Sequence, residues 1–303
     1  MLSLKDAIIQ TIAYFDLFEY APTLLDIERW LLKTDESHTL SNIRRALKND
    51  LRIQQCEGLY ILRGREALTQ TRKHKYTWTE QKWKRTKRYI RLLASMPYVE
   101  GIFLVNSMGW HNARQSSDID LLIVTTPGHI WSARFWTTVA MKLLRQRPHE
   151  QANERALCLS LYVAADRLNL EPYRLSKADI HYTFWVNQCY PLYDSGQYTQ
   201  FTHENGWIRD TFSNIRWASQ SERRTITLSR VERMLQYVRR IACNEWLLKK
   251  IQLHILPEKL RTLANTDQRV VMNEHILKLH TNDTREQRQH DWAERVNTLQ
   301  QHA

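Results

Sequence analysis

Apolar residues recur every three or four positions through the first fifty residues, a spacing typical of helices that bury one face. Two short runs that follow, around the turn Cys56-Glu57-Gly58, have the composition of paired strands. Residues 1–64 are therefore predicted to form one compact unit. Its expected elements are helices from Leu4 to Phe15, over 24–32 after Pro22, and from Thr39 or Ser41 to Leu47, then strands over 51–55 and 59–62.

The next hundred residues alternate between helical and strand patterns. Residues 66–95 predict one long helix with Trp83, Ile90 and Leu93 on its buried stripe, ending at Met96-Pro97 because the residue before proline disfavours the helical region. Alternation of strands and helices then indicates an α/β sheet domain. The expected elements are strands over 101–105, 119–125 and 157–163, and a helix over 130–144 with Trp131, Phe135, Val139 and Leu143 inward.

From about residue 171 the pattern is mainly helical, clearest at 181–185, over 230–255 and over 284–300. Residues 268–280 fit a short strand or a helix equally well. The predicted fold class is thus mixed, α/β with α+β. Its expected divisions are a unit over 1–64, a connector helix over 65–97, a sheet core over 98–170 and a mainly helical region over 171–303.

Composition adds limits to this picture. The hydrophobic content of 43% and charged content of 25% are those of ordinary globular proteins. No apolar run approaches the roughly 20 residues that span a bilayer, and the N-terminus lacks a signal-peptide layout. The four cysteines are dispersed, which argues against a disulfide framework or a structural zinc site. We expect a cytoplasmic protein that has no membrane partner.

The net charge of +12 is unevenly distributed. Residues 65–95 hold ten basic and two acidic side chains, a net of +8, and residues 222–262 a net of +6. Residues 1–64 have a net charge of −1. Basic surfaces attract nucleic acid, nucleotides and acidic proteins. Residues 65–95 are therefore a candidate nucleic-acid contact, and a merely solvated helix face is the alternative.

The strand over 119–125 begins beside a candidate catalytic pair. Asp118 and Asp120, separated by one residue, project from the same face, while Ile119 and Leu121 point to the opposite face. Neighbouring carboxylates repel each other unless a cation lies between them. Mg²⁺, which takes oxygen ligands from one or two carboxylates and from substrate phosphates, suits such a pair, and Mn²⁺ is the other ion considered.

Upstream, Asn106-Ser107 lies where the strand over 101–105 ends, and the backbone amides of such a turn can hold phosphates. This stretch resembles the signature of nucleotidyltransferases of the DNA polymerase β superfamily, in the version of its small bacterial members. The signature consists of a hydrophobic strand, a Gly-Ser-like turn, a spacer, which is ten residues here (108–117), and Asp-Ile-Asp. The resemblance is confined to about 100–125, and more loosely to 165.

The resemblance implies a function. Asp118 and Asp120 would be catalytic and would hold Mg²⁺, while a nucleoside triphosphate such as ATP would be the substrate. The protein would transfer a nucleoside monophosphate from the triphosphate to a hydroxyl of a nucleic acid, a protein or a small molecule. The nucleotide-binding residues that the motif implies are Asn106, Ser107, Gly109, Arg114 and Ser117.

Two departures from the family pattern keep a second function open. Asn106 stands where the family has glycine, although asparagine tolerates unusual backbone angles. Active members also carry a third carboxylate on a later strand. Here the strand over 157–163 has Ser160 at its centre, and the nearest acids are Glu154 and Asp166. The alternative is a catalytically inactive member that acts as a nucleic-acid- or protein-binding regulator.

The unit over 1–64 resembles a winged helix in its order of elements. That resemblance would make its third helix the recognition helix, with Asn42, Arg44, Arg45 and Lys48 exposed. The net charge of −1 disfavours DNA, since phosphate neutralisation supplies most non-specific affinity. Protein docking or dimerisation is the alternative.

Weaker candidates lie elsewhere. Metal binding by side chains within 274–283 is less favoured than surface or packing roles, because their spacing matches no zinc signature. These side chains are Glu274, His275, His280 and Asp283. His111, beside the motif, is a candidate phosphate contact, and an incidental role is favoured for it.

Overall fold

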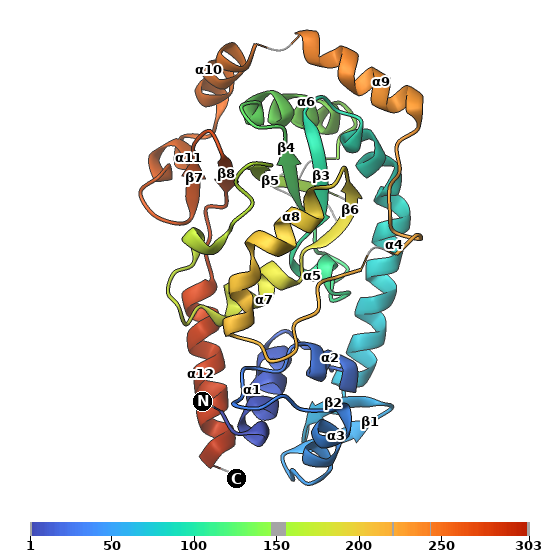
Figure 1. Ribbon diagram of the computed structural model, residues 1–303, viewed down its shortest axis with the longest axis vertical. Coiled ribbons are helices and arrows are strands. Elements are labelled where there is room, and N and C mark those ends of the chain that lie inside the picture. The colour runs from blue at the N-terminus through green and yellow to red at the C-terminus, as the bar shows by residue number, and fades with distance from the viewer. Residues whose placement is uncertain (1, 147–155, 220, 243, 302–303) are drawn as a thin grey trace.

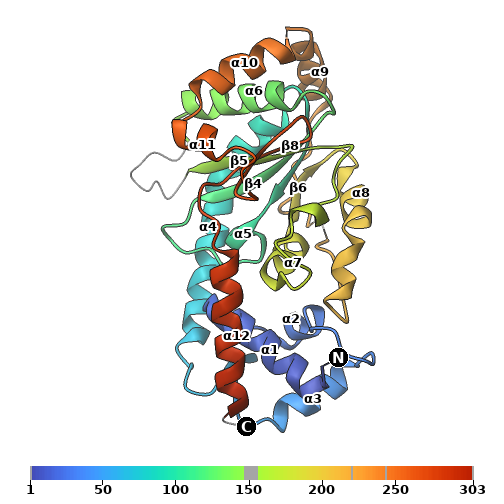
Figure 2. The same cartoon turned by 90° about the vertical axis from the view of Figure 1, so that its left-hand side faces the viewer.

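The computed structural model describes residues 2–146, 156–219, 221–242 and 244–301. The molecule is long and narrow, with an N-terminal helical unit at one end, a β-sheet in the middle and a pair of helices at the other end (Figure 1). One long helix, α4, runs along the side from the N-terminal unit to the sheet (Figure 2).

The N-terminal unit has the predicted order of three helices and a hairpin. Ser3, Thr23 and Thr39 each accept a hydrogen bond from the backbone three residues on, which caps the three helices. The second helix ends at Arg29 rather than Leu32, because the chain from Leu31 pairs instead with residues 211–213. The elements are α1 (Leu4–Leu17), α2 (Leu24–Arg29), α3 (Leu40–Lys48), β1 (Ile53–Cys56) and β2 (Leu59–Leu62).

The connector helix is α4 (Leu68–Ala94), and its predicted buried stripe at Trp83, Ile90 and Leu93 is confirmed. Two of its lysines are also buried. The Nζ of Lys75 donates to the carbonyl of Phe18 at 2.7 Å, and that of Lys82 to the carbonyls of the loop before β4. Part of the positive charge counted over 65–95 therefore joins elements together and is not offered to solvent.

The sheet has six strands in the order β6-β3-β4-β5-β8-β7. Only β4 and β5 pair in parallel, so the sheet is mixed and the fold is of mixed α and β type. The strands are β3 (Val99–Leu104), β4 (Ile119–Thr125), β5 (Leu157–Ala164), β6 (Tyr190–Asp194), β7 (Val270–Met272) and β8 (Ile276–Leu279).

Both edges of the sheet come from beyond the range 98–170 predicted for the core. The region over 171–303, expected to be mainly helical, supplies β6 on one side and β7 and β8 on the other. The ambiguous residues 268–280 thus contain two strands and no helix. Strands of three to five residues are too short for their own periodicity to identify them.

Helices cover the two faces of the sheet. On one face α4 and α6 (Ile130–Leu143) pack on Leu104, Ile119 and Leu121. On the other face α7 (Ile180–Asn187) and α8 (Gln197–Glu204) pack on Phe103, Leu122 and Val163.

The predicted inner face of α6 was wrong in part. Trp131 is buried, but Leu143 is 79% exposed, and the buried stripe runs instead through Ala133, Thr137 and Met141. The polar member of this stripe is satisfied internally, because the Thr137 hydroxyl lies 2.9 Å from the hydroxyl of Tyr162.

The single helix predicted over 230–255 is divided. It forms α9 (Arg230–Val238), the short turn η3 (Arg239–Ala242) and α10 (Glu245–Ile255). Asn244 caps α10, and the Glu245 carboxylate accepts hydrogen bonds from the first backbone amides of α6. The remaining elements are η1 (Glu171–Tyr173), η2 (Gly206–Asp210), α11 (Glu258–Leu263) and α12 (Arg285–Gln301).

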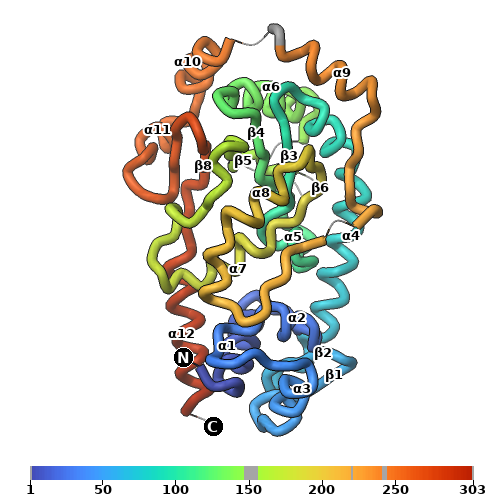
Figure 3. The backbone as a smooth tube through the Cα atoms, viewed as in Figure 1, coloured from blue at the N-terminus to red at the C-terminus, as the bar shows by residue number. Residues whose placement is uncertain are grey.

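The last helix returns to the beginning of the chain. α12 packs along α1, and the indole nitrogen of Trp292 donates to the carbonyl of Gln10 at 3.0 Å. Both chain ends therefore lie at the same end of the molecule (Figure 3). Among the residues described, no helix has the length and apolarity required to cross a membrane.

Candidate metal and nucleotide site

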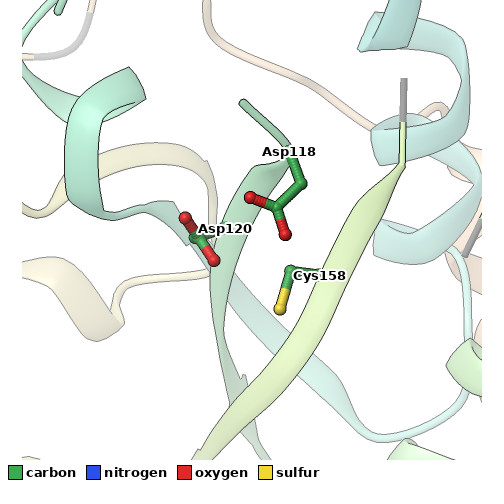
Figure 4. Close-up of side chains that lie close together, drawn as sticks. All are labelled: Asp118, Asp120 and Cys158. Carbon is green, nitrogen blue, oxygen red and sulfur yellow. The ribbon is translucent and has the colours of Figure 1, made fainter. Parts of the chain in front are cut away.

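The paired carboxylates lie at the start of β4, on the face covered by α7. The next residues on that face, Leu122 and Val124, belong to the α7–α8 core, whereas Ile119 and Leu121 belong to the α4–α6 core. The prediction that Asp118 and Asp120 share a face is confirmed, since their carboxylate oxygens lie within 4.8 Å of each other. Figure 4 shows the pair on one strand and a third side chain on its neighbour.

That third side chain is Cys158 of β5. It is the register partner of Asp120 in the parallel β4–β5 pair, and its sulfur lies within 4.8 Å of an oxygen of each carboxylate. In the part of the chain that the structure describes, this is the one group of His, Cys, Asp or Glu side chains close enough to hold a metal ion.

Burial raises the pKa values of all three groups, and neighbouring negative charge adds to the shifts of Asp120 and Cys158. Burial, then the charge of Asp118, raises the pKa of Asp120 to about 6, and burial raises the pKa of Asp118. Burial, then the charge of Asp120, raises the pKa of Cys158 to about 12. Burial thus makes the ionised form of each group unfavourable, and a cation bound between them would favour the ionised forms.

The turn after β3 forms the short helix α5 (Asn106–Gly109). Asn106 has φ of 53°, the left-handed region, so the predicted tolerance of asparagine for this position is confirmed. Its side-chain oxygen accepts a hydrogen bond from the Trp185 indole at 2.7 Å, and its side chain also hydrogen-bonds to Asp120. Asn106 therefore does what glycine cannot, because it fixes one of the carboxylates against α7.

Gly109 is required for the close packing of this turn. A Cβ atom there would lie 2.5 Å from the carbonyl oxygen of Gln188, at the end of α7. Ser107 is half-buried beside it, and its carbonyl accepts the amide of Asn112 at 2.8 Å, which closes the loop.

The other two predicted nucleotide-binding residues organise the loop before β4. The hydroxyl of Ser117 accepts the amide of Arg114 at 3.1 Å, and Lys82 donates to the carbonyls of Gln115 and Ser117 at 2.8 and 2.7 Å. The guanidinium of Arg114 pairs with Glu19, at 3.0 Å, in the turn after α1. Arg114 is therefore directed to the N-terminal unit and is not gathered with the Asp pair.

A cavity of about 200 Å³ adjoins the turn at Asn106. His280 in its wall lies 2.9 Å from the hydroxyl of Ser160, which in turn accepts the thiol of Cys158 at 3.1 Å, so the cavity and the Asp–Cys group are connected. The rest of the wall includes aromatic rings, charged groups and aliphatic side chains. They include Tyr173, His181, Tyr182, Trp185, Lys278, Asp283 and Arg285.

The charged groups of this cavity largely neutralise each other. Arg285 forms ion pairs with Asp283 at 2.6 Å and with Asp179 at 3.4 Å. Burial and the charge of Arg285 lower the pKa of Lys278 to about 8. The charged groups in and beside the cavity are therefore paired with one another.

The remaining candidates from the sequence do not join the site. Glu154 lies outside the described residues, and Asp166 lies 3.8 Å from His275 beyond the other end of β5. Glu274 faces Lys249, and Asp283 is held by Arg285, so the side chains within 274–283 do not converge.

His111, a candidate phosphate contact, is instead held by other side chains of the protein. Its Nδ1 lies 2.9 Å from the guanidinium of Arg224, and its ring stacks on Tyr76. Burial and Arg224 lower its pKa to about 3, so it is neutral near pH 7.

The sequence analysis missed three contributors, Cys158, Lys82 and Trp185, and it considered His280 only as a metal ligand. The one signal available for Cys158 was its alternation with Ser160, which places both on a single face of a strand. The others come from segments far away in the sequence, and their approach depends on the fold.

The donor set fits a divalent cation. Two carboxylates fit Mg²⁺, whereas the thiol in third place is not among its ligands. In comparisons with known proteins, no family model, no curated protein and no solved structure matches this chain.

Proposed function

We propose that this protein is a nucleotidyltransferase of the DNA polymerase β type, which transfers a nucleoside monophosphate from a nucleoside triphosphate to an acceptor hydroxyl. The observation that carries the proposal is the pair Asp118 and Asp120, held on one face of β4 directly beside the α5 turn. The raised pKa of Asp120, which is due first to burial and then to the charge of Asp118, is consistent with it, since a bound cation would favour the ionised carboxylates.

The residues have distinct tasks in this reaction. Asp118 and Asp120 would hold Mg²⁺, or Mn²⁺, which supplies neutralising charge to the phosphates when bound. The α5 turn, with Ser107, would receive the β- and γ-phosphates. The acceptor oxygen forms a bond to the α-phosphorus, the bond to the bridging oxygen breaks, and pyrophosphate leaves. The acceptor proton passes to solvent.

A second candidate function rests on Cys158. The family's third carboxylate serves as a metal ligand and helps to activate the acceptor, whereas in the described residues the third side chain beside this Asp pair is the thiol of Cys158. An inactive, nucleotide-sensing protein is the function that this observation favours. Such a protein would act through its N-terminal unit, as a regulator that binds nucleic acid or protein.

The N-terminal unit gives both candidates a possible contact surface. We propose that it is a winged helix, and the residues expected to be exposed on α3, Asn42, Arg44, Arg45 and Lys48, are exposed. The outer side of α4 adds Lys84, Arg85, Lys87 and Arg88, also exposed, as a track for a polyanion.

Labelled nucleotides test the proposal. The protein is incubated with Mg²⁺ or Mn²⁺ and each α-labelled triphosphate, with cell extract as acceptor, beside an Asp118→Asn/Asp120→Asn variant. We expect label transfer and pyrophosphate release from the unchanged protein alone, with a loss of at least about 100-fold in the variant. If the unchanged protein releases no more pyrophosphate than the variant, the proposed enzymatic activity is overturned. Retained metal-dependent nucleotide binding would then support the sensor.

A further inference from the structure

We propose that the Asp118–Asp120–Cys158 group binds a thiophilic divalent cation of the Zn²⁺ class more tightly than it binds Mg²⁺. Asp118 and Asp120 would supply carboxylate oxygens and Cys158 a thiolate. The inference rests on the proposed function for placing a cation at the Asp pair. The identity of the ion is tested without any nucleotide transfer.

The positions of the three ligand atoms suit a small tetrahedral ion. Zinc binds oxygen at about 2.0–2.2 Å and sulfur at about 2.3 Å, which puts neighbouring ligand atoms about 3.5 Å apart. The three atoms here already lie within 4.8 Å of one another, so a modest side-chain rotation closes the set. Three protein ligands also leave one position for water or a phosphate oxygen, as in catalytic zinc sites.

The backbone fixes these ligands on adjacent strands. Asp120 and Cys158 are register partners in the parallel β4–β5 pair, and Asp118 lies one residue before β4. Strands paired in this way hold their side chains at a constant separation, in contrast to ligands on a loop. The site is therefore largely formed before an ion arrives.

The chemistry of the third ligand decides between ions. Mg²⁺ requires oxygen ligands and near-octahedral geometry, and it usually retains several waters. Soft thiolate ligands favour zinc and related ions. A carboxylate on β5 would keep the site selective for hard ions, and Cys158 shifts that preference.

Groups around the ligands are placed to hold them. Asn106 hydrogen-bonds to Asp120 and is fixed by Trp185. Ser160 hydrogen-bonds to Cys158 and is fixed by His280. When the ion binds, the thiol proton leaves to solvent and the Ser160 hydroxyl can turn to donate to the thiolate. Such partners orient metal ligands and raise affinity by roughly 10–100-fold.

Cobalt provides a direct test, because a Co²⁺–thiolate bond gives a charge-transfer absorption in the near ultraviolet. The chelator-treated full chain is titrated with Co²⁺, and Zn²⁺ and Mg²⁺ are then compared as competitors. We expect the band to saturate at one equivalent, to disappear with equimolar Zn²⁺ and to persist in a large excess of Mg²⁺.

Three variants locate the ligand. Cys158→Ser is expected to lose the band and to bind Zn²⁺ at least about tenfold more weakly. Cys56→Ser, a matched control in the distant β1–β2 hairpin, should keep both. Cys158→Asp should lose the band and gain Mg²⁺ affinity. Thermal unfolding shows that each variant is folded, and a Zn²⁺-dependent rise in Tm in the unchanged protein is a second readout of binding.

The outcomes separate this inference from the proposed function. A band that survives in Cys158→Ser, or that Mg²⁺ removes as readily as Zn²⁺, overturns the inference. Failure to bind Co²⁺ or Zn²⁺ also overturns it, while Mg²⁺-dependent nucleotide transfer would still support the proposed function. Thiolate-bound cobalt in a protein that transfers no nucleotide overturns the enzyme and leaves the zinc-class site supported.

Discussion

Two helical regions, α1 in the N-terminal unit and α9–α10 at the opposite end, differ in how much of their apolar surface they bury. In α1, ten consecutive residues from Ala7 to Asp16 are buried, enclosed by α3, α7 and α12. In α9 the buried residue is Gln236, and in α10 it is Gln252. Most apolar side chains of α9 and α10 are exposed instead, although Leu253 packs against the core. They include Val231, Met234, Tyr237, Trp246, Leu247 and Ile255.

The glutamines of α9 and α10 attach these helices through polar contacts. The side-chain amide of Gln236 donates to the carbonyls of Ala94, Met96 and Val99 at 2.8–3.2 Å. That of Gln252 donates to the carbonyl of Trp131 at 2.7 Å. Hydrophobic spacing alone therefore reveals a helix but does not say which side of it the fold covers.

The largest effect is expected when a buried isoleucine of α1 is shortened to alanine, and an exposed isoleucine of α10 provides the comparison. Ile12→Ala in α1 should lower the free energy of unfolding by about 2–5 kcal/mol, since Ile12 is 1% exposed and its removal leaves a cavity. Urea unfolding at constant pH measures the loss. A decrease below about 1 kcal/mol would contradict the burial of α1.

Acid should weaken the N-terminal end next. His181 of α7 stacks on Phe18 and hydrogen-bonds to the Tyr14 hydroxyl at 2.9 Å, and burial lowers its pKa to about 4. In the unfolded chain the histidine has a pKa of about 6.5, so as the pH falls it takes up a proton before the folded protein does. Stability is thus complete above pH 6.5 and decreases as the pH falls towards 4.

His181 is expected to lower the free energy of unfolding by an amount on the order of 2–3 kcal/mol at pH 4.5. The His181→Asn variant, whose amide can still meet Tyr14, should show a pH dependence smaller by this amount between pH 7.5 and 4.5. Denaturant unfolding at the two pH values measures it. An unchanged pH dependence would assign the acid sensitivity to other groups, such as His111.

A smaller and local effect is expected where α9 is attached. Gln236→Met keeps the side-chain volume but removes a hydrogen-bond donor from three main-chain carbonyls, which costs about 1–3 kcal/mol. Amide hydrogen exchange should increase in α9 and remain unchanged in α1. Equal protection of α9 in the variant and the original protein would show that its apolar residues hold the helix.

The smallest effect is expected at Ile255 of α10, which is 63% exposed. Ile255→Ala should change the free energy of unfolding by less than about 0.5 kcal/mol, as for other surface substitutions. The same urea measurement compares it with Ile12→Ala. Similar losses at the two positions would remove the distinction between the two ends.

The sequence predicted elements best where periodicity was long or burial one-sided. α4 was expected over 66–95 and spans Leu68–Ala94, and β4 matches the prediction residue for residue. The buried face of α6 was misassigned because Thr137 looks exposed by polarity alone and is buried with Tyr162 as its partner. The short strands β6, β7 and β8 are defined by neighbours far away in the sequence.

The residues of the candidate site likewise fall into those that local spacing could predict and those that it could not. Asp118 and Asp120 could be placed together from spacing, because the period of a strand is fixed by its geometry. Cys158 could not, since its approach depends on the register between β4 and β5. The sequence analysis compared Asn106 with glycine only in the backbone angles that each tolerates. The hydrogen bond of its side chain could not be predicted without the position of Trp185.

The packing of α12 on α1 has a consequence for how the chain matures during synthesis. The N-terminal unit is synthesised long before α12, yet Trp292 and Leu299 of α12 pack against the core of that unit. Until they arrive, part of that core is exposed to water. The N-terminal unit is thus completed only after α12 has been made, and a chain that ends before Arg285 keeps this apolar surface uncovered.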